Sequence, residues 1–288
     1  VTKVKTGIVF EGGAFRTIFS CGVMDALVEN DIMPDYMIGV SAGAAYGVSM
    51  ASKQPRRNLD VLMKYRNDKR YLGLSNMIDK DNKSIYGLEF SYETIPNELN
   101  LFDYDAFKQY KGDFYCVVTN LLTGQPEYMK YTGDDRTNTV LKATCALPML
   151  FPPIIINDVP YMDGGLSDSI PYLKAIEDAC DRIIVVLTRQ SGYTKTTSRS
   201  TKAIAYSYRN QYPKLTETML TRASRYNESL KGLDQYVKEG RIITIQPTTS
   251  KGFSRLEKDK NKILSMYNDG YNQCYELLDT IKEFYGIK

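Results

Sequence analysis

The chain of 288 residues carries a net charge of +3, is 43% hydrophobic and 25% charged, and contains no histidine and no tryptophan. Histidine is the usual general base and the commonest protein metal ligand, so its absence excludes a Ser-His-Asp triad, a Cys-His pair and any His-ligated zinc or iron site. The composition is that of a globular protein with a core, and no apolar run approaches the ~20 residues of a membrane span.

The cysteines and the first residues of the chain indicate in which cellular compartment the protein is expected. The five cysteines are an odd number and show no CxxC spacing, which is typical of a reduced, intracellular protein rather than a disulfide scaffold. The residues before the first apolar run lack the anatomy of a signal peptide. We therefore expect a soluble cytoplasmic protein.

The chain opens with a repeated alternation of short apolar runs and helical patterns. Residues 6–10 form an apolar run that stops at two glycines, and residues 15–29 carry apolar side chains at helical spacing. Residues 36–40 form a second run, and the small side chains of residues 42–50 suit a helix. This order of strand, helix, strand and helix favours a parallel sheet.

The middle of the chain continues the alternation less regularly. Residues 59–65 favour a helix, whereas residues 68–112 are polar and irregular and suggest an excursion at the edge of the sheet. The further elements expected before residue 190 are a hairpin over 114–120 and 125–131, helices over 139–147 and 171–179, and short strands over 154–156, 160–162 and 182–187.

The C-terminal third has a different character. We expect mostly amphipathic helix over 201–240, a last strand over 241–246 and one terminal helix over 259–285. We divide the chain into a catalytic α/β domain over 1–190 and a mostly helical C-terminal extension over 191–288, packed on that domain.

This third is also basic. Residues 189–262 hold 16 Lys and Arg against 6 Asp and Glu. These charges can cover solvated helix faces, or they can form a surface for peripheral contact with anionic lipid headgroups, where each cation contributes about 1 kcal/mol. No nucleic-acid-binding motif accompanies them, so nucleic acid is not an expected partner.

Residues 39–43 read Gly-Val-Ser-Ala-Gly and match the G-x-S-x-G nucleophile elbow. The elbow turns a strand sharply into a helix, and the flanking glycines, Gly39 and Gly43, leave room for that turn. Ser41 would then stand at the apex, with the amide of Ala42 at a helix N-terminus beside it. The alternative is a tight turn with a structural serine.

A glycine pair, Gly12 and Gly13, follows the first expected strand. Their free amides and the following helix would favour an anion, as in an oxyanion hole. A nucleotide-binding loop is the alternative, but the spacing is neither G-x-G-x-x-G nor a Walker A loop. Because neighbouring parallel strands end at one edge of a sheet, this loop and Ser41 should lie together.

Asp163 precedes Gly164 and Gly165 at the end of a short expected strand. Without histidine, Ser41 needs another base, and an aspartate at a strand end is the obvious candidate. An ordinary Asp-Gly turn is the alternative.

Together these segments resemble the patatin-like phospholipase family, which carries GGGxRG, then G-x-S-x-G, then D-G-[GA]. The counterparts are residues 12–17, 39–43 and 163–165, and residues 142–148 resemble the family's helix and proline before the aspartate. The resemblance covers about residues 5–190. It implies an α/β three-layer sandwich with a mostly parallel central sheet flanked by helices, and the C-terminal hundred residues resemble the helical extension of bacterial members.

The resemblance also implies roles for individual residues. Ser41 would be the nucleophile and Asp163 the general base and then acid, while amides of Gly12, Gly13 and Ala14 would hold the oxyanion. Arg16 would brace the loop. Ala14 and Thr17 replace family glycines, and Ala14 is tolerable unless its position needs a positive φ.

The implied activity is that of a serine esterase acting on lipid or other acyl esters, a phospholipase A-type reaction of lipid metabolism and degradation. Such a dyad requires no metal and no cofactor. The alternative is a catalytically degenerate protein that binds lipid or acyl ligands. Several apolar residues could line an acyl groove, although core packing is the commoner role of such residues: Met50, Met77, Met149, Leu150 and Phe151. No oligomeric state follows from the sequence.

Overall fold

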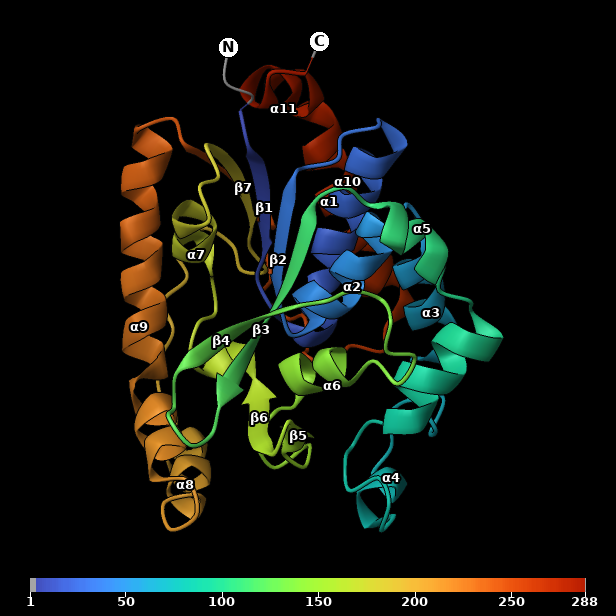
Figure 1. Ribbon diagram of the computed structural model, residues 1–288, viewed down its shortest axis with the longest axis vertical. Helices are drawn as coiled ribbons and strands as arrows, with labels where there is room; N and C mark the ends of the chain where they lie inside the picture. Colours follow the sequence, from blue (N-terminus) through green and yellow to red (C-terminus); the bar gives the residue numbers. More distant parts are fainter. Residues whose placement is uncertain (1–3, 288) are drawn as a thin grey trace.

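The computed structural model describes residues 4–287 and has one central sheet between two layers of helices (Figure 1). The sheet has eight strands: β1 (Thr6–Phe10), β2 (Tyr36–Val40), β3 (Asp113–Asn120), β4 (Pro126–Lys130), β5 (Ile154–Ile156), β6 (Val159–Asp163), β7 (Arg182–Val186) and β8 (Ile242–Ile245). This architecture confirms the expected mixed α/β fold.

The strand order is β5-β6-β3-β2-β1-β7-β8, with β4 paired to β3 outside this path. The central strands from β3 through β2, β1 and β7 to β8 run parallel. Strands β4, β5 and β6 pair antiparallel at the other side. The parallel part of the sheet therefore contains β1 and β2, which precede the first two glycine-rich motifs. The antiparallel part contains β6, which ends at Asp163.

The helices follow the expected alternation with the strands. They are α1 (Ile18–Glu29), α2 (Ala42–Ala51), α3 (Arg57–Tyr65), α4 (Ser75–Ile78), α5 (Tyr104–Gln109), α6 (Thr139–Cys145), α7 (Tyr172–Glu177), α8 (Arg199–Ser207), α9 (Pro213–Lys238), α10 (Lys260–Glu276) and α11 (Leu278–Tyr285). Within residues 4–287 the structure also has two 3₁₀ segments, η1 (Ala14–Thr17) and η3 (Gly164–Leu166), and the π-helix η2 (Phe90–Leu99).

The core is two-sided because successive strand side chains point to opposite faces. Ile8 and Phe10 of β1 pack with α1, α2 and α10 on one face, whereas Val9 packs with α7 and α9 on the other. Figure 1 shows α9 and α7 on one side of the sheet and α1, α2 and α10 on the opposite side. All five residues of β1 and of β2 are buried, as expected for strands covered on both faces.

The C-terminal region joins this fold through both the sheet and the helices. Strand β8 pairs parallel with β7, which extends the central sheet by one strand. Helix α10 lies along α1, and a Cβ on Gly22 would come 2.1 Å from the carbonyl oxygen of Tyr267. The two helix backbones therefore touch with no room for a side chain between them.

Three expectations differ from the structure. Residues 68–112 are not an irregular excursion: they contain α4, η2 and α5, and Ile95, Phe102 and Phe107 are buried in the main core. The expected terminal helix ends at Glu276 and restarts at Leu278, and the helical stretch over 201–240 is interrupted between α8 and α9.

Within residues 4–287, no helix combines the length and apolar character needed to cross a bilayer.

Candidate active site

Ser41 lies at a sharp turn between β2 and α2. Its backbone has φ of 55° and ψ of −127°, a conformation that costs a non-glycine residue about 1–3 kcal/mol. A Cβ on Gly39 would come 2.5 Å from the Ala44 amide nitrogen, and one on Gly43 would come 2.5 Å from the Phe10 carbonyl oxygen. Both flanking glycines are thus required by close backbone approach, and the turn is the strand–turn–helix arrangement of an elbow.

Sheet register brings Asp163 to the same place. Val40 pairs with Val117 across the parallel β2–β3 ladder, and Val118 pairs with Asp163 across the antiparallel β3–β6 ladder. Strand β3 therefore connects the end of β2 to the end of β6. Gly164 follows so closely that a Cβ there would meet the Val117 carbonyl oxygen at 2.1 Å.

The Asp163 carboxyl group is buried, with 2% of the residue exposed. Burial raises its pKa above the ordinary value, because the charged form loses hydration. The nearby Ser41 side chain, the charge of Arg222 and the Gly165 amide, which donates to Oδ1 at 2.7 Å, act in the opposite direction. A buried carboxylate that lines the same cavity as a serine side chain, and whose pKa is raised, has the properties of a general base.

The glycine pair lies directly against Ser41. A Cβ on Gly12 would come 2.9 Å from the Ser41 Cβ, and one on Gly13 would come 2.8 Å from the Thr188 hydroxyl. Among the residues that the structure describes, the amides of Gly12, Gly13 and Ala14 donate no hydrogen bond to another protein group. These amides are therefore free to bind an oxyanion.

Ala14 has φ of 50°, so this position does require the left-handed conformation that its family counterpart, a glycine, adopts without cost. An alanine there loses about 1–2 kcal/mol to the contact between Cβ and the carbonyl group. The Thr17 hydroxyl, at the second departure from the family pattern, is buried without a hydrogen-bond partner in the described chain.

Helix α6 supplies two site residues that the sequence motifs did not single out. The Ser41 amide donates to the Thr144 hydroxyl at 2.9 Å, and that hydroxyl donates to the Val117 carbonyl oxygen. Cys145 lines a cavity together with Ser41, and burial raises the pKa of its thiol to about 12. Residues 142–148 resembled a family segment, but their contacts with Ser41 depend on tertiary packing.

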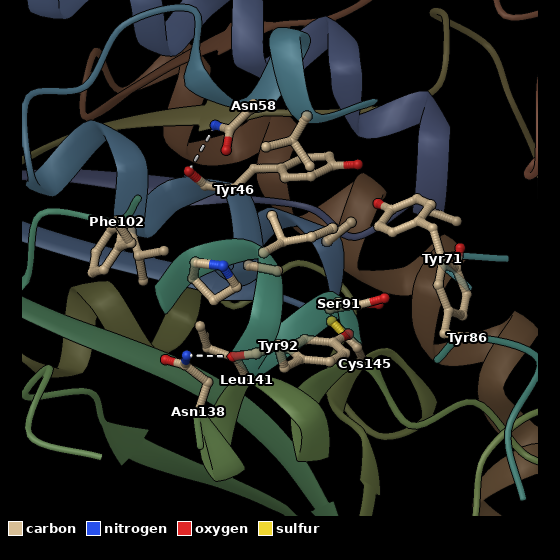
Figure 2. A pocket seen from close by; sticks show the side chains of 18 of the residues that line it. Tyr46, Asn58, Tyr71, Tyr86, Ser91, Tyr92, Phe102, Asn138, Leu141 and Cys145 are labelled. Carbon is tan, nitrogen blue, oxygen red and sulfur yellow. Dashed lines mark hydrogen bonds between the residues drawn. The ribbon is translucent and has the colours of Figure 1, made fainter. Parts of the chain in front are cut away.

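An apolar cavity of about 130 Å³ opens beside Ser41 (Figure 2). Its walls come from α2, η2 and α6, and they include Tyr46, Tyr92 and Leu141. Of the five residues expected to line an acyl groove, only Phe151 does so. Met50 is core, whereas Met77 and Met149 are more than a third exposed.

A second, polar cavity is also lined by Ser41, and its wall includes Asp163. Arg16 is only 6% exposed, lines this cavity, and has no hydrogen-bond partner for its Nε in the described chain. Within residues 4–287, no three acidic or cysteine side chains lie together in a position to hold a metal ion.

Two family models match the chain. Residues 8–176 match the model of patatin-like phospholipases, and residues 212–286 match a domain of unknown function, DUF6363. The chain is 26% identical over 196 residues to the uncharacterized protein YjjU of Escherichia coli, covering 64% of this chain and 52% of YjjU. It is 28% identical over 183 residues to lysophospholipase nte1 of Aspergillus terreus, covering 60% of this chain and 11% of that protein.

The chain thus spans about half the length of YjjU and about a tenth of the fungal lysophospholipase. Among solved structures, VipD from Legionella pneumophila matches with a TM-score of 0.48 at 15% identity, covering 96% of this chain and 67% of that one. The match to the family model includes Gly12, Ser41 and Asp163 and extends over more than half of the sequence. The chain belongs to the patatin-like phospholipase family.

Proposed function

We propose that this protein is a serine acyl-ester hydrolase in which Ser41 is the nucleophile and Asp163 the general base. The observation that carries the proposal is that Ser41, with its strained backbone, and the buried Asp163 carboxyl group line the same polar cavity. Membership of a phospholipase family and the likeness to a lysophospholipase support a lipid ester as substrate.

The reaction would begin with attack of the Ser41 hydroxyl on the ester carbonyl carbon. Asp163 accepts the hydroxyl proton, and the negative oxygen of the tetrahedral intermediate is held by the amides of Gly12, Gly13 and Ala14. When the C–O bond of the ester breaks, Asp163 gives its proton to the departing alcohol. Water, deprotonated by Asp163, then releases the acid from Ser41.

The oxyanion site has to supply much of the rate enhancement. A carboxylate is a weak base for a serine hydroxyl even with a raised pKa, whereas one preorganised donor can be worth about 10²–10³ in kcat. Esters, which have better leaving groups than amides, suit this arrangement.

The test is hydrolysis of water-soluble short-chain esters by the wild-type protein, by Ser41→Ala and by Asp163→Asn. We expect turnover by the wild type and its loss in both variants. A degenerate acyl-binding protein would bind the esters in all three forms and turn over none of them, which would overturn the proposal.

A further inference from the structure

The polar cavity beside Ser41 is lined by an unusual concentration of cations. Five side chains contribute positive charge, whereas Glu11 and Asp163 are the two acids in the wall; the five cations are Arg16, Arg189, Lys195, Arg222 and Arg255. When all seven groups are ionised, the wall carries a surplus of three positive charges. Its volume is about 40 Å³, and one water needs about 10–15 Å³, so it suits a compact polar group the size of a few waters.

These cations are not members of a salt-bridge network. Within residues 4–287, none of the five lies within 4.0 Å of a carboxylate oxygen. Glu11 is occupied by the Thr188 amide at 2.7 Å and by the Tyr226 hydroxyl at 2.8 Å. Arg16 is buried and Arg189, Lys195 and Arg222 are half-buried, whereas Arg255 is exposed. Removing cations from water without a carboxylate partner is costly, and such a cost is usually relieved by a bound anion or by pairing.

Neutral groups hold several of these side chains in place. Arg222 Nε donates to the Gly165 carbonyl oxygen at 2.5 Å, and the Lys195 ammonium lies 4.2 Å from the centre of the Tyr226 ring. The Arg189 guanidinium lies 4.4 Å from the centre of the Tyr193 ring. The side chains are therefore positioned while their charge remains available.

The cations also disturb one another. The pKa of Lys195 is lowered to about 7 by burial and then by the charge of Arg222, and the pKa of Arg16 is lowered to about 10 by burial and then by Arg189 and Arg255. An anion in the cavity would oppose both shifts, because it stabilises the charged form of each side chain.

We propose that this cavity binds a phosphate monoester carried by the alcohol part of the substrate, and that the C-terminal region supplies its recognition. The proposal rests on the proposed esterase function. Ser41 borders both cavities, so the acyl group would enter the apolar one while the phosphate occupies the polar one. A phosphate monoester carries nearly two negative charges at neutral pH, and the planar fork of arginine matches its oxygens.

Arg222 lies on α9 and Arg255 precedes α10, within the segment matched by the domain of unknown function. The proposal therefore gives that segment a role in substrate recognition. Because the alcohol leaves with the phosphate, these arginines would be specificity residues rather than catalytic ones.

The kinetic test compares 1-hexanoylglycerol 3-phosphate with 1-hexanoylglycerol, which differ only in the phosphate. We expect the wild type to prefer the phosphorylated ester in kcat/KM by about tenfold or more, since one charged hydrogen bond is worth at least that factor. Arg255→Gln and Arg189→Gln should each reduce this preference severalfold. Lys258→Gln, which removes an exposed positive charge outside the cavity wall, should keep it.

Thermal unfolding of the wild type distinguishes the source of the phosphate. Glycerol 3-phosphate should raise the melting temperature relative to sodium chloride at equal ionic strength, and Arg222→Gln should diminish the shift. A rise with inorganic phosphate but no kinetic preference would identify a site for the free ion and overturn the proposal. Equal kcat/KM for the two esters without any thermal shift would also overturn it. Stabilisation by glycerol 3-phosphate with no hydrolysis of either ester would refute the esterase function while leaving the phosphate site standing.

Discussion

Asp163 is the residue on which the proposed chemistry depends. It acts as a base only when ionised, so the rate must rise as the pH rises through its pKa. Because burial raises that pKa above 3.8, the midpoint of the acid limb of kcat/KM should lie above 3.8. A neutral ester is the right substrate for this profile, since Lys195, with a pKa of about 7, would otherwise affect binding of an anionic one.

Replacing Asp163 by Asn should lower kcat/KM by about 10²–10⁴-fold, the usual contribution of a general base, and should abolish the acid limb. The folded state favours the protonated form of Asp163, so this group makes the protein less stable as the pH rises through its pKa. The Asn variant should therefore unfold at an equal or higher temperature than the wild type at pH 7. An unchanged pH profile of residual activity would contradict the assignment of Asp163.

Gly12 and Ala14 make a matched pair within the oxyanion loop. Gly12→Ala places a Cβ 2.7 Å from the Val40 carbonyl oxygen, so the loop must move away from Ser41, and we expect activity to fall by about 10²-fold, as for loss of an oxyanion donor. Ala14→Gly instead relieves a positive φ and should preserve activity. Steady-state kinetics of both variants check this contrast, and equal loss in the two would contradict it.

At the level of elements, the packing of α1 on α10 makes the clearest stability prediction. A Cβ on Gly270 would come 2.0 Å from the Phe19 carbonyl oxygen, where backbone must move to admit it. Gly270→Ala should therefore destabilise the protein by about 1–3 kcal/mol despite the better helix propensity of alanine. Asn268→Ala, at an exposed position of the same helix, is the control and should change the free energy of unfolding by less than about 0.5 kcal/mol. Denaturant unfolding measures both.

The sequence was most informative where local pattern and burial coincide. Strands β1 and β2 have the predicted bounds. Each is a short apolar run that is buried throughout and is followed by a glycine-containing turn. The prediction for residues 68–112 is wrong because tertiary contacts hold this segment in place. The Ile85 amide, for example, donates to the Leu150 carbonyl oxygen. Its π-helix includes Pro96, which argues against a helix in the sequence alone.

The candidate site divides in the same way. Ser41 and Asp163 could be predicted because each belongs to a short motif with a turn of its own. Arg222 and Arg255 could not, since they have no local motif and reach the cavity only through the packing of α9 and of the loop before α10. The sequence shows the excess of positive charge over residues 189–262. It does not show that some of these cations line a cavity. Peripheral contact of the remaining cations with an anionic membrane stays a prediction.

For the whole molecule, the apolar cavity predicts a limited acyl length. A cavity of 150 Å³ holds benzene, so about 130 Å³ suits an acyl segment of about six carbons. Across esters of one alcohol with acyl chains of 4 to 16 carbons, kcat/KM should peak near six to eight. Ala45→Leu, which adds bulk to the cavity wall, should move the optimum to shorter chains. A steady increase up to sixteen carbons would contradict this reading of the cavity.

The central claim is that Ser41 is an activated nucleophile, and covalent labelling with a fluorophosphonate tests it most directly. Intact mass and peptide mapping should show one adduct on Ser41, absent in Ser41→Ala and formed much more slowly in Asp163→Asn. A folded wild-type protein that gains no adduct, or gains it at another residue, would contradict the account.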